Sequence, residues 1–173
     1  IGLHPTSVKE EFEEEIENIR ALLVSRKFWG IGETGIDLYW DKTFTEQQRV
    51  SFMAHISLAK EHRLPLIIHC RESFSAITSV LDAVADNSLK GIFHAFTGTP
   101  EQAKKVISYG FKIGIGGIVT FKNSGLAETV ESIEPGHIVL ETDSPYLAPA
   151  PLRGKRNESS YLIHIVEKLA DIY

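Results

Sequence analysis

Residues 64–71 have the sequence LPLIIHCR, an apolar run that ends in polar residues. Its branched aliphatic residues predict a strand buried on both faces, because such strands are uniformly apolar rather than alternating. A helical pattern follows at about residues 75–85. A strand followed by a helix indicates a βαβ unit, in which successive strands run parallel and are joined by right-handed crossovers.

The same alternation continues on both sides of this run. We expect further strands at residues 28–32, 91–94, 111–115 and 137–141, and further helices near residues 12–23, 46–62, from 100, 126–133 and from 160. The first residues read as the end of one more strand, which makes about six. Two α/β architectures fit this order, an open doubly wound sheet and a (β/α)8 barrel.

Local signals predict how several of these helices begin. Ser7 with Glu10 predicts a capping box before an acidic helix whose charged residues face solvent. Thr99, Pro100 and Gln102 predict a second capping box, with proline at the first helical position. The last helix is expected to bury several apolar residues: Leu162, Ile165, Val166 and Leu169.

Composition narrows the class of protein. The 173 residues are 43% hydrophobic and 24% charged, which is typical of a single globular domain. The net charge of −5 argues against non-specific nucleic-acid binding through a large basic surface. Cys70 is the only cysteine, which excludes disulfide scaffolds and favours a reducing compartment, so we expect a cytoplasmic protein. No apolar run approaches the ~18–20 residues of a membrane span, and nothing indicates an obligate protein partner.

Residues that can bind metals follow the predicted strands: Glu33, His69, His94 and Asp143. A single histidine at such a position is more often a hydrogen-bonded core residue, but four ligand-type residues at four strand ends favour a shared site. In parallel α/β folds the carboxyl ends of the strands meet at one face, where ligands bind. Carboxylates and imidazoles suit Mg²⁺, Mn²⁺ or Zn²⁺, and a carboxylate near a metal-activated water can serve as general base.

Neighbouring residues add candidate substrate contacts. His69 and Arg71 are two apart on an extended segment and point to one side, so Arg71 can contact a substrate phosphate. Cys70 points to the other side and is expected to be a packed thiol. The basic loop of residues 153–156 follows the last strand and can also contact phosphate. Three histidines within helices are expected on the surface or behind the metal ligands: His55, His62 and His164.

Six segments in this order resemble the TatD family of metal-dependent deoxyribonucleases, which belongs to the amidohydrolase-like barrels. They are GLHP at residues 2–5, GETGID at 32–37, PLIIHCR at 65–71, FHAFTG at 93–98, ETDSPYLAP at 141–149 and RGKRNE at 153–158. Each segment alone is a weak signal, whereas six in the family's order are specific.

The resemblance implies a TIM-type barrel with two divalent metal ions, Mg²⁺, Mn²⁺ or Zn²⁺, in the active site of the complete enzyme. Glu33 would match the bridging carboxylate, and His69 and His94 the ligands of the second metal. Asp143 would match the aspartate that ligates the first metal and takes the proton of the water. Three residues would line the substrate cleft: His4, Arg71 and Arg153. The implied activity is hydrolysis of DNA phosphodiesters, typically from the 3′ ends of single strands.

The family's first strand carries Asp-x-His-x-His, which this sequence does not contain. We therefore expect residues 1–173 to form one metal-dependent hydrolase barrel domain that lacks the first one or two βα units. Two other hypotheses stay open. The same metal barrel could hydrolyse an amide or ester, for example as an aminoacyl-tRNA deacylase, or the chain could be a truncated scaffold without catalysis.

Overall fold

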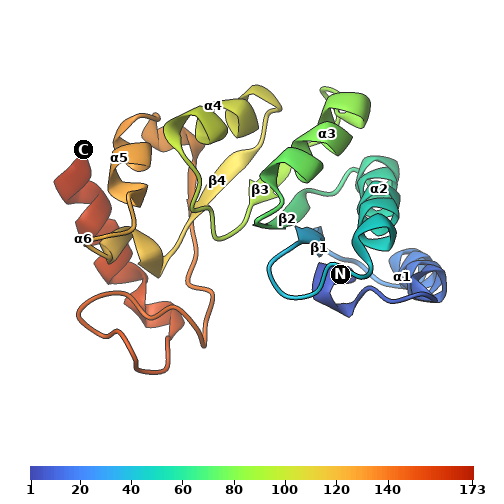
Figure 1. The fold of residues 1–173 in the computed structure, drawn as a ribbon, viewed down its shortest axis with the longest axis horizontal. Helices are drawn as coiled ribbons and strands as arrows, with labels where there is room; N and C mark the ends of the chain where they lie inside the picture. The colour runs from blue at the N-terminus through green and yellow to red at the C-terminus, as the bar shows by residue number, and fades with distance from the viewer. The chain divides into compact units, whose positions relative to one another are not determined.

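The computed structural model describes residues 1–173, which form two compact units, Ile1–Ile92 and Phe93–Tyr173. Strands and helices alternate along the chain, and the parallel strand order follows the sequence, β1-β2-β3-β4-β5 (Figure 1). The α/β alternation expected from the sequence is thus confirmed, with five strands. None of the helices combines the length and the hydropathy that crossing a bilayer requires.

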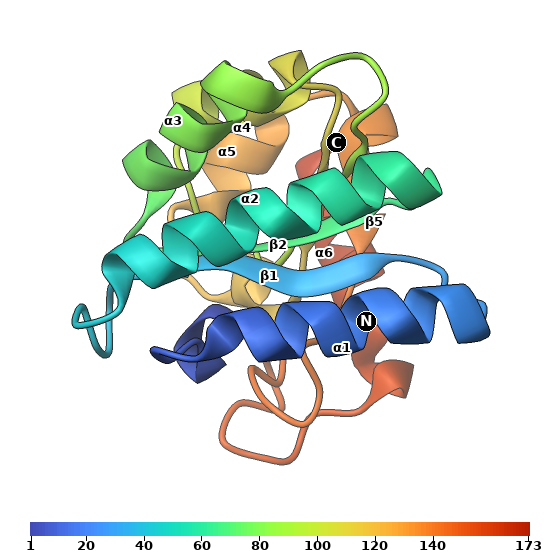
Figure 2. The same ribbon diagram turned by 90° about the vertical axis from the view of Figure 1, so that its right-hand side faces the viewer.

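The first unit holds two parallel strands with helices packed along them. Its elements are η1 (Pro5–Ser7), α1 (Phe12–Ser25), β1 (Ile31–Asp37), α2 (Thr45–His62), β2 (Leu66–Arg71), α3 (Phe74–Val84) and the start of β3 (Gly91–Phe93). Figure 2 shows α1 and α2 running alongside β1. Parallel pairing places Gly35 opposite His69 and Asp37 opposite Arg71. Residues from β1, β2 and α2 fill the core, and Ile36, Phe52 and Ile68 are buried there.

The first strand is longer than the sequence indicated. We expected it at residues 28–32, with Glu33 at its end, but β1 begins at Ile31 and continues to Asp37, so Glu33 lies in its first half. Its glycines suggest a turn, yet they are required by a close approach of strands: a Cβ on Gly35 would lie 2.1 Å from the His69 carbonyl oxygen. The first residues are not a strand, although the Ile1 carbonyl oxygen accepts a hydrogen bond from the Gly32 N–H at 2.7 Å.

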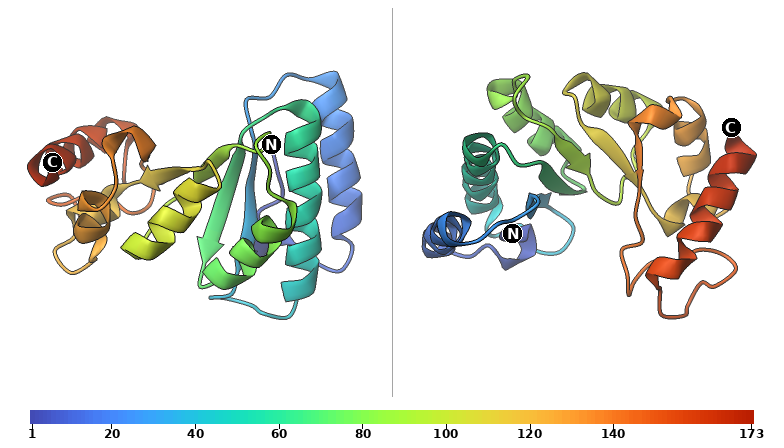
Figure 3. Two further views of the ribbon diagram at one scale, coloured as in Figure 1. Left: turned by 90° about the horizontal axis from the view of Figure 1, so that it is seen from above. Right: turned by 180° about the vertical axis from the view of Figure 1, so that it is seen from behind.

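The second unit is built from short elements. They are α4 (Pro100–Ser108), β4 (Lys112–Ile115), η2 (Gly117–Thr120), α5 (Leu126–Glu131), η3 (Pro135–His137), β5 (Ile138–Leu140), η4 (Ser159–Tyr161) and α6 (Leu162–Ile172). Figure 3 shows α6 in red beside α5. The Tyr173 hydroxyl at the end of α6 donates to the carbonyl oxygens of Val130 and Ile133, at 2.9 and 2.8 Å, and anchors the chain end to α5.

The predicted helix starts and faces were partly correct. The capping box of Thr99 and Gln102 is present at α4, with Pro100 in the first turn. The box expected from Ser7 was wrong, because Ser7 lies in the short helix η1 and α1 begins only at Phe12. In α6 Ile165 is buried, but Val166 is 42% exposed because it lies on the outer face of the helix.

Gly35 ties the fold to the position of His69, and this can be tested. Gly35→Ala is expected to lower the free energy of unfolding by at least about 2 kcal/mol, because its Cβ overlaps β2 at a φ of 140°. Gly110 also has a positive φ, of 84°, but its Cβ would meet open space. Gly110→Ala should therefore lose only about 1 kcal/mol. Urea unfolding measures both, and equal losses would contradict the close approach.

Candidate metal centre

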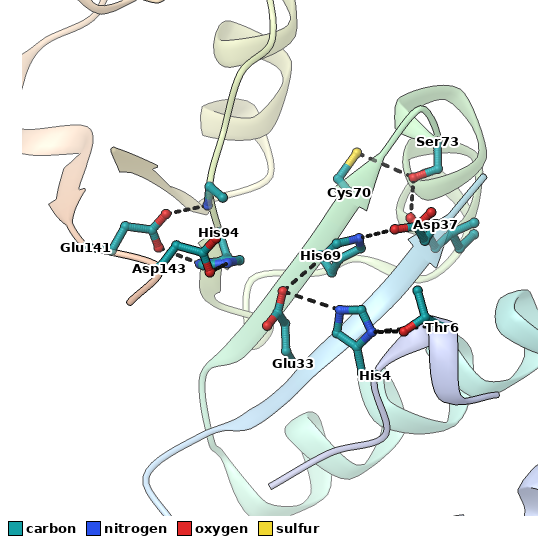
Figure 4. Close-up of polar contacts among 12 residues, drawn as sticks. His4, Thr6, Glu33, Asp37, His69, Cys70, Ser73, His94, Glu141 and Asp143 are labelled. Atoms are coloured by element: carbon teal, nitrogen blue, oxygen red, sulfur yellow. Dashed lines mark hydrogen bonds and ion pairs between the residues drawn. The ribbon is translucent and has the colours of Figure 1, made fainter. Parts of the chain in front are cut away.

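A cluster of ligand-type side chains lies in the first unit. His4, Glu33 and His69 each offer one ligand atom, and these atoms lie within 4.8 Å of one another. Nδ1 of His69 is 3.0 Å from Oε1 of Glu33, and Nε2 of the same ring is 2.8 Å from Oδ2 of Asp37 (Figure 4). An ionised carboxylate only accepts hydrogen bonds, so each of these ring nitrogens lies where an N–H can donate: Nε2 faces the buried Asp37 and Nδ1 faces Glu33.

His4 reaches the same cluster from the residue before η1. Its Nε2 lies 3.8 Å from Oε1 of Glu33, and its ring stands edge-on to the His69 ring with centroids 4.6 Å apart. Nδ1 of His4 is 2.7 Å from the Thr6 hydroxyl. The resemblance placed His4 along a substrate cleft, whereas its position here also offers a third ligand atom to a cation held by Glu33 and His69.

Asp37 contacts the ring nitrogen of His69 that points away from Glu33. Its side chain is buried, with 2% of the residue exposed, and burial by itself raises the pKa of a carboxyl. Hydrogen bonds from His69 and from the N–H groups of Tyr39 and Trp40, with the charge of His69, outweigh that effect and lower the pKa of Asp37 below its usual value. Asp37 is therefore an anion at neutral pH. Our sequence reasoning gave it no role, although it stands within the GETGID segment.

His55 fixes the segment that carries His4. The sequence suggested a surface position or one behind the ligands, and the structure shows the side chain fully buried in α2. Its Nε2 accepts a hydrogen bond from the Leu3 N–H at 3.0 Å, and Nδ1 is 2.7 Å from the Ser51 carbonyl oxygen. Burial lowers the pKa of His55 and keeps the ring neutral, which its role as acceptor requires.

A second histidine–carboxylate cluster lies in the other unit. His94 follows β3 directly, and its Nδ1 is 2.6 Å from Oε2 of Glu141, while its Nε2 is 3.5 Å from Oδ1 of Asp143 (Figure 4). Glu141 also accepts a hydrogen bond from the Ala95 N–H. Asp143 has a left-handed backbone with φ of 54°, a conformation that non-glycine residues adopt mainly where function or packing requires it. Glu141 is the second residue that sequence reasoning missed.

The donor sets fit divalent cations. In both clusters one ring nitrogen of a histidine lies against a supporting carboxylate and the other faces a second carboxylate. A supporting carboxylate of this kind orients imidazole ligands of metals. The structure thus brings Glu33 to His69 in one unit and His94 to Asp143 in the other. That all four residues share one pocket stays a prediction.

The remaining candidates lie near aromatic rings. The Arg71 guanidinium is 3.9 Å from the ring centroid of Tyr39, and that of Arg153 is 4.2 Å from Phe121. Arg153 also lines a cavity of about 640 Å³ in the second unit. Burial raises the pKa of the Cys70 thiol, as expected for a packed rather than a reactive cysteine.

Comparison with known proteins identifies the family. A family model described as TatD related DNase matches residues 1–173. The chain belongs to the TatD family. A similar protein of Bacillus subtilis (strain 168), named an uncharacterized metal-dependent hydrolase, YabD, is 39% identical over 99% of this chain and 68% of its own length. Another, of Pantoea vagans (strain C9-1), is named 3′-5′ ssDNA/RNA exonuclease TatD and is 33% identical over 98% of this chain and 67% of its own.

Solved structures agree with this assignment. The crystal structure of YJJV, a TatD homologue from Escherichia coli K12, matches with a TM-score of 0.92 and 26% identity over 99% of this chain and 67% of that one. A TatD family hydrolase from Entamoeba histolytica matches with a TM-score of 0.80. These matches confirm the fold class expected from the sequence. The chain spans about two thirds of the length of these relatives, 68% of the Bacillus subtilis protein and 67% of YJJV.

The contact between Asp37 and His69 predicts that replacing Asp37 lowers the affinity for a metal ion. Asp37→Asn is expected to weaken binding of Mn²⁺ or Zn²⁺ by about 10–100-fold, because the amide no longer fixes the tautomer and orientation of His69. Asp41→Asn is the control, since Asp41 is exposed and accepts only from its own loop at Thr43. Calorimetric titration measures both, and equal affinities for the two variants would contradict the role of Asp37.

The buried, neutral His55 predicts that the free energy of unfolding decreases at acid pH. Because the pKa of His55 is lower in the folded chain, the unfolded chain binds the extra proton, and stability falls as the pH drops below about 6.5. Between about pH 7.5 and about pH 5.5 we expect a loss of up to about 1.4 kcal/mol that His55→Gln lacks. Urea unfolding in chelator measures this difference, and an identical pH dependence in the two proteins would argue against it.

Proposed function

We propose that this TatD protein is a metal-dependent deoxyribonuclease that hydrolyses phosphodiester bonds at the 3′ ends of single-stranded DNA. The observation that carries the proposal is the pair of histidine–carboxylate clusters, one around Glu33 and His69 and one around His94 and Asp143. The relative from Pantoea vagans, named as a 3′-5′ ssDNA/RNA exonuclease, supports a nucleic-acid substrate.

We propose that Glu33, His69, His94 and Asp143 hold two divalent cations, Mg²⁺, Mn²⁺ or Zn²⁺, in one domain formed by residues 1–173. Bound cations of this kind act as Lewis acids, lower the pKa of water and offset charge that develops on phosphate oxygens. The carboxylates carry the negative charge that such ions require, and Asp37 and Glu141 fix the histidine rings.

Asp143 is the proposed general base. A water oxygen attacks phosphorus, Asp143 accepts the proton of that water, and the bond from phosphorus to the 3′ oxygen of the preceding nucleotide breaks. Water supplies the proton that the leaving oxygen takes up, so atoms and charge balance. Glu33 would help to hold the cations, which makes Glu33 and Asp143 both part of the proposed catalytic machinery.

Two arginines are the proposed phosphate contacts. Both Arg71 and Arg153 are exposed, and their guanidinium groups present several N–H donors suited to phosphate oxygens. Other proposals from the sequence stand beside these: a cytoplasmic location, which the single cysteine Cys70 supports, and activity without an obligate protein partner.

Another hydrolase activity has one specific observation in its favour. The relative from Bacillus subtilis is named only for metal-dependent hydrolysis, and arginines that grip a phosphate do not determine which bond is broken. An aminoacyl ester on tRNA therefore remains the second candidate, and assays on single-stranded DNA, a small amide and an aminoacyl ester distinguish the two.

The base can be tested directly. Asp143→Asn is expected to lower the rate of nucleotide release from 3′ ends by about 10²–10⁴-fold, because an amide cannot accept the proton of the water. The measurement is the initial rate on a 3′-labelled single strand with Mg²⁺ or Mn²⁺. Asp171→Asn, on the exposed side of α6, is the control and should keep the wild-type rate. A wild-type rate for Asp143→Asn would refute the proposed base.

A further inference from the structure

We propose that Tyr39, Trp40 and Arg71 form a stacking subsite that binds a nucleobase and the adjacent phosphate of a single strand. This inference rests on the proposed function, because it assigns a contact surface to a nucleic-acid substrate. It concerns residues of the first unit alone, and the side chains of Tyr39 and Trp40 have no role in the metal centre described above.

The two rings are unusually open to solvent for their size. Tyr39 is 47% exposed and Trp40 is 69% exposed, and their rings meet edge to face with centroids 4.7 Å apart. The Arg71 guanidinium lies 3.9 Å from the Tyr39 centroid and 5.2 Å from that of Trp40. Aromatic faces bind bases of any sequence by stacking, and an arginine beside them adds a phosphate contact. Together they match the chemistry of a single strand.

The backbone under these rings is held by the candidate metal centre itself. Oδ1 of Asp37 accepts from the Tyr39 N–H at 3.0 Å and from the Trp40 N–H at 3.4 Å. Oδ2 of the same carboxylate is bonded to His69. One buried side chain therefore orients both a metal ligand and the aromatic pair, and a base stacked on the pair would be held at a fixed place relative to Glu33 and His69.

A hollow lies next to one side of the subsite. It has a volume of about 210 Å³, and Trp40, Lys9 and Phe44 contribute to its lining. The Lys9 ammonium lies 5.2 Å from the centroid of the Phe44 ring, so a second cation stands near the surface of Trp40. Asp41 is the opposing charge in this loop, and its carboxylate accepts from the Thr43 N–H. Asp37 also lines the hollow, so the cations Arg71 and Lys9 face two carboxylates, of which Asp37 is buried and bonded to His69.

The chain supplies a matched control. Trp29 is 81% exposed and has the Lys27 ammonium 4.4 Å from its ring centroid, so it is also an exposed indole beside a cation. Trp29 is not paired with a second aromatic ring and has no hydrogen bond to the Asp37 carboxylate. A generic attraction between DNA and exposed tryptophans would involve Trp29 as much as Trp40.

The test uses tryptophan fluorescence in chelator, where hydrolysis does not occur. The chain has two tryptophans, so Trp29→Phe leaves Trp40 as the only indole. Single-stranded oligothymidylate is expected to quench this emission on binding, whereas a strand of equal length with abasic sites should quench it far less. The converse protein, Trp40→Phe, should show little quenching. Equal quenching by both strands, or quenching of Trp29 alone, overturns the subsite.

Affinity separates the subsite from the proposed hydrolysis. By anisotropy of a labelled strand, Tyr39→Ala and Trp40→Ala should each bind about tenfold more weakly, and Trp29→Ala should bind like the wild type. Arg71→Lys keeps the charge but loses the planar guanidinium, so weaker binding there supports a specific contact of this group with the strand rather than charge alone. Unchanged melting temperatures show that the variants fold. Wild-type affinity in these variants overturns the subsite even if DNA is cleaved. Weakened binding in a protein that cleaves no DNA supports the subsite and contradicts the nuclease.

Discussion

The buried carboxylate of Asp37 is the contact on which the first unit's site depends. One carboxylate oxygen faces the His69 ring, and the other accepts from the loop N–H groups of Tyr39 and Trp40. The backbone N–H of Asp37 donates to the side-chain oxygen of Gln48 in α2. A buried anion is costly unless hydrogen bonds satisfy it, and here they do. The end of β1, the start of its loop and the ring of His69 are therefore fixed together.

The second unit repeats this chemistry with other residues. Glu141 bonds both the His94 ring and the Ala95 N–H, and so fixes the residue that follows β3. In both units one ring nitrogen of the histidine lies against a supporting carboxylate, Asp37 or Glu141, and the other faces a carboxylate of ligand type, Glu33 or Asp143. Carboxylates gathered in this way repel one another, and divalent cations would offset that repulsion. The gathering of carboxylates around His69 and His94 thus favours metal binding over a purely structural role for these residues.

Much of the fold could be predicted from the sequence, because apolar runs such as residues 66–68 and the capping box at Thr99 are local signals. β1 was misplaced because Gly35 suggests a turn, and only the position of β2 shows that a close approach demands glycine there. The ligand candidates followed from strand ends. Asp37 and Glu141 did not, because a supporting role depends on which ring nitrogen a carboxylate reaches in space, and sequence spacing carries no such information.

The most direct measurement is anomalous X-ray scattering from crystals of the protein loaded with Mn²⁺ or Zn²⁺. We predict ions within bonding distance of Glu33 and His69 and of His94 and Asp143, gathered in one cluster that includes Glu33. Saturated crystals whose ions lie elsewhere, or in which the two histidines bind ions too far apart for one carboxylate to bridge, would contradict this prediction.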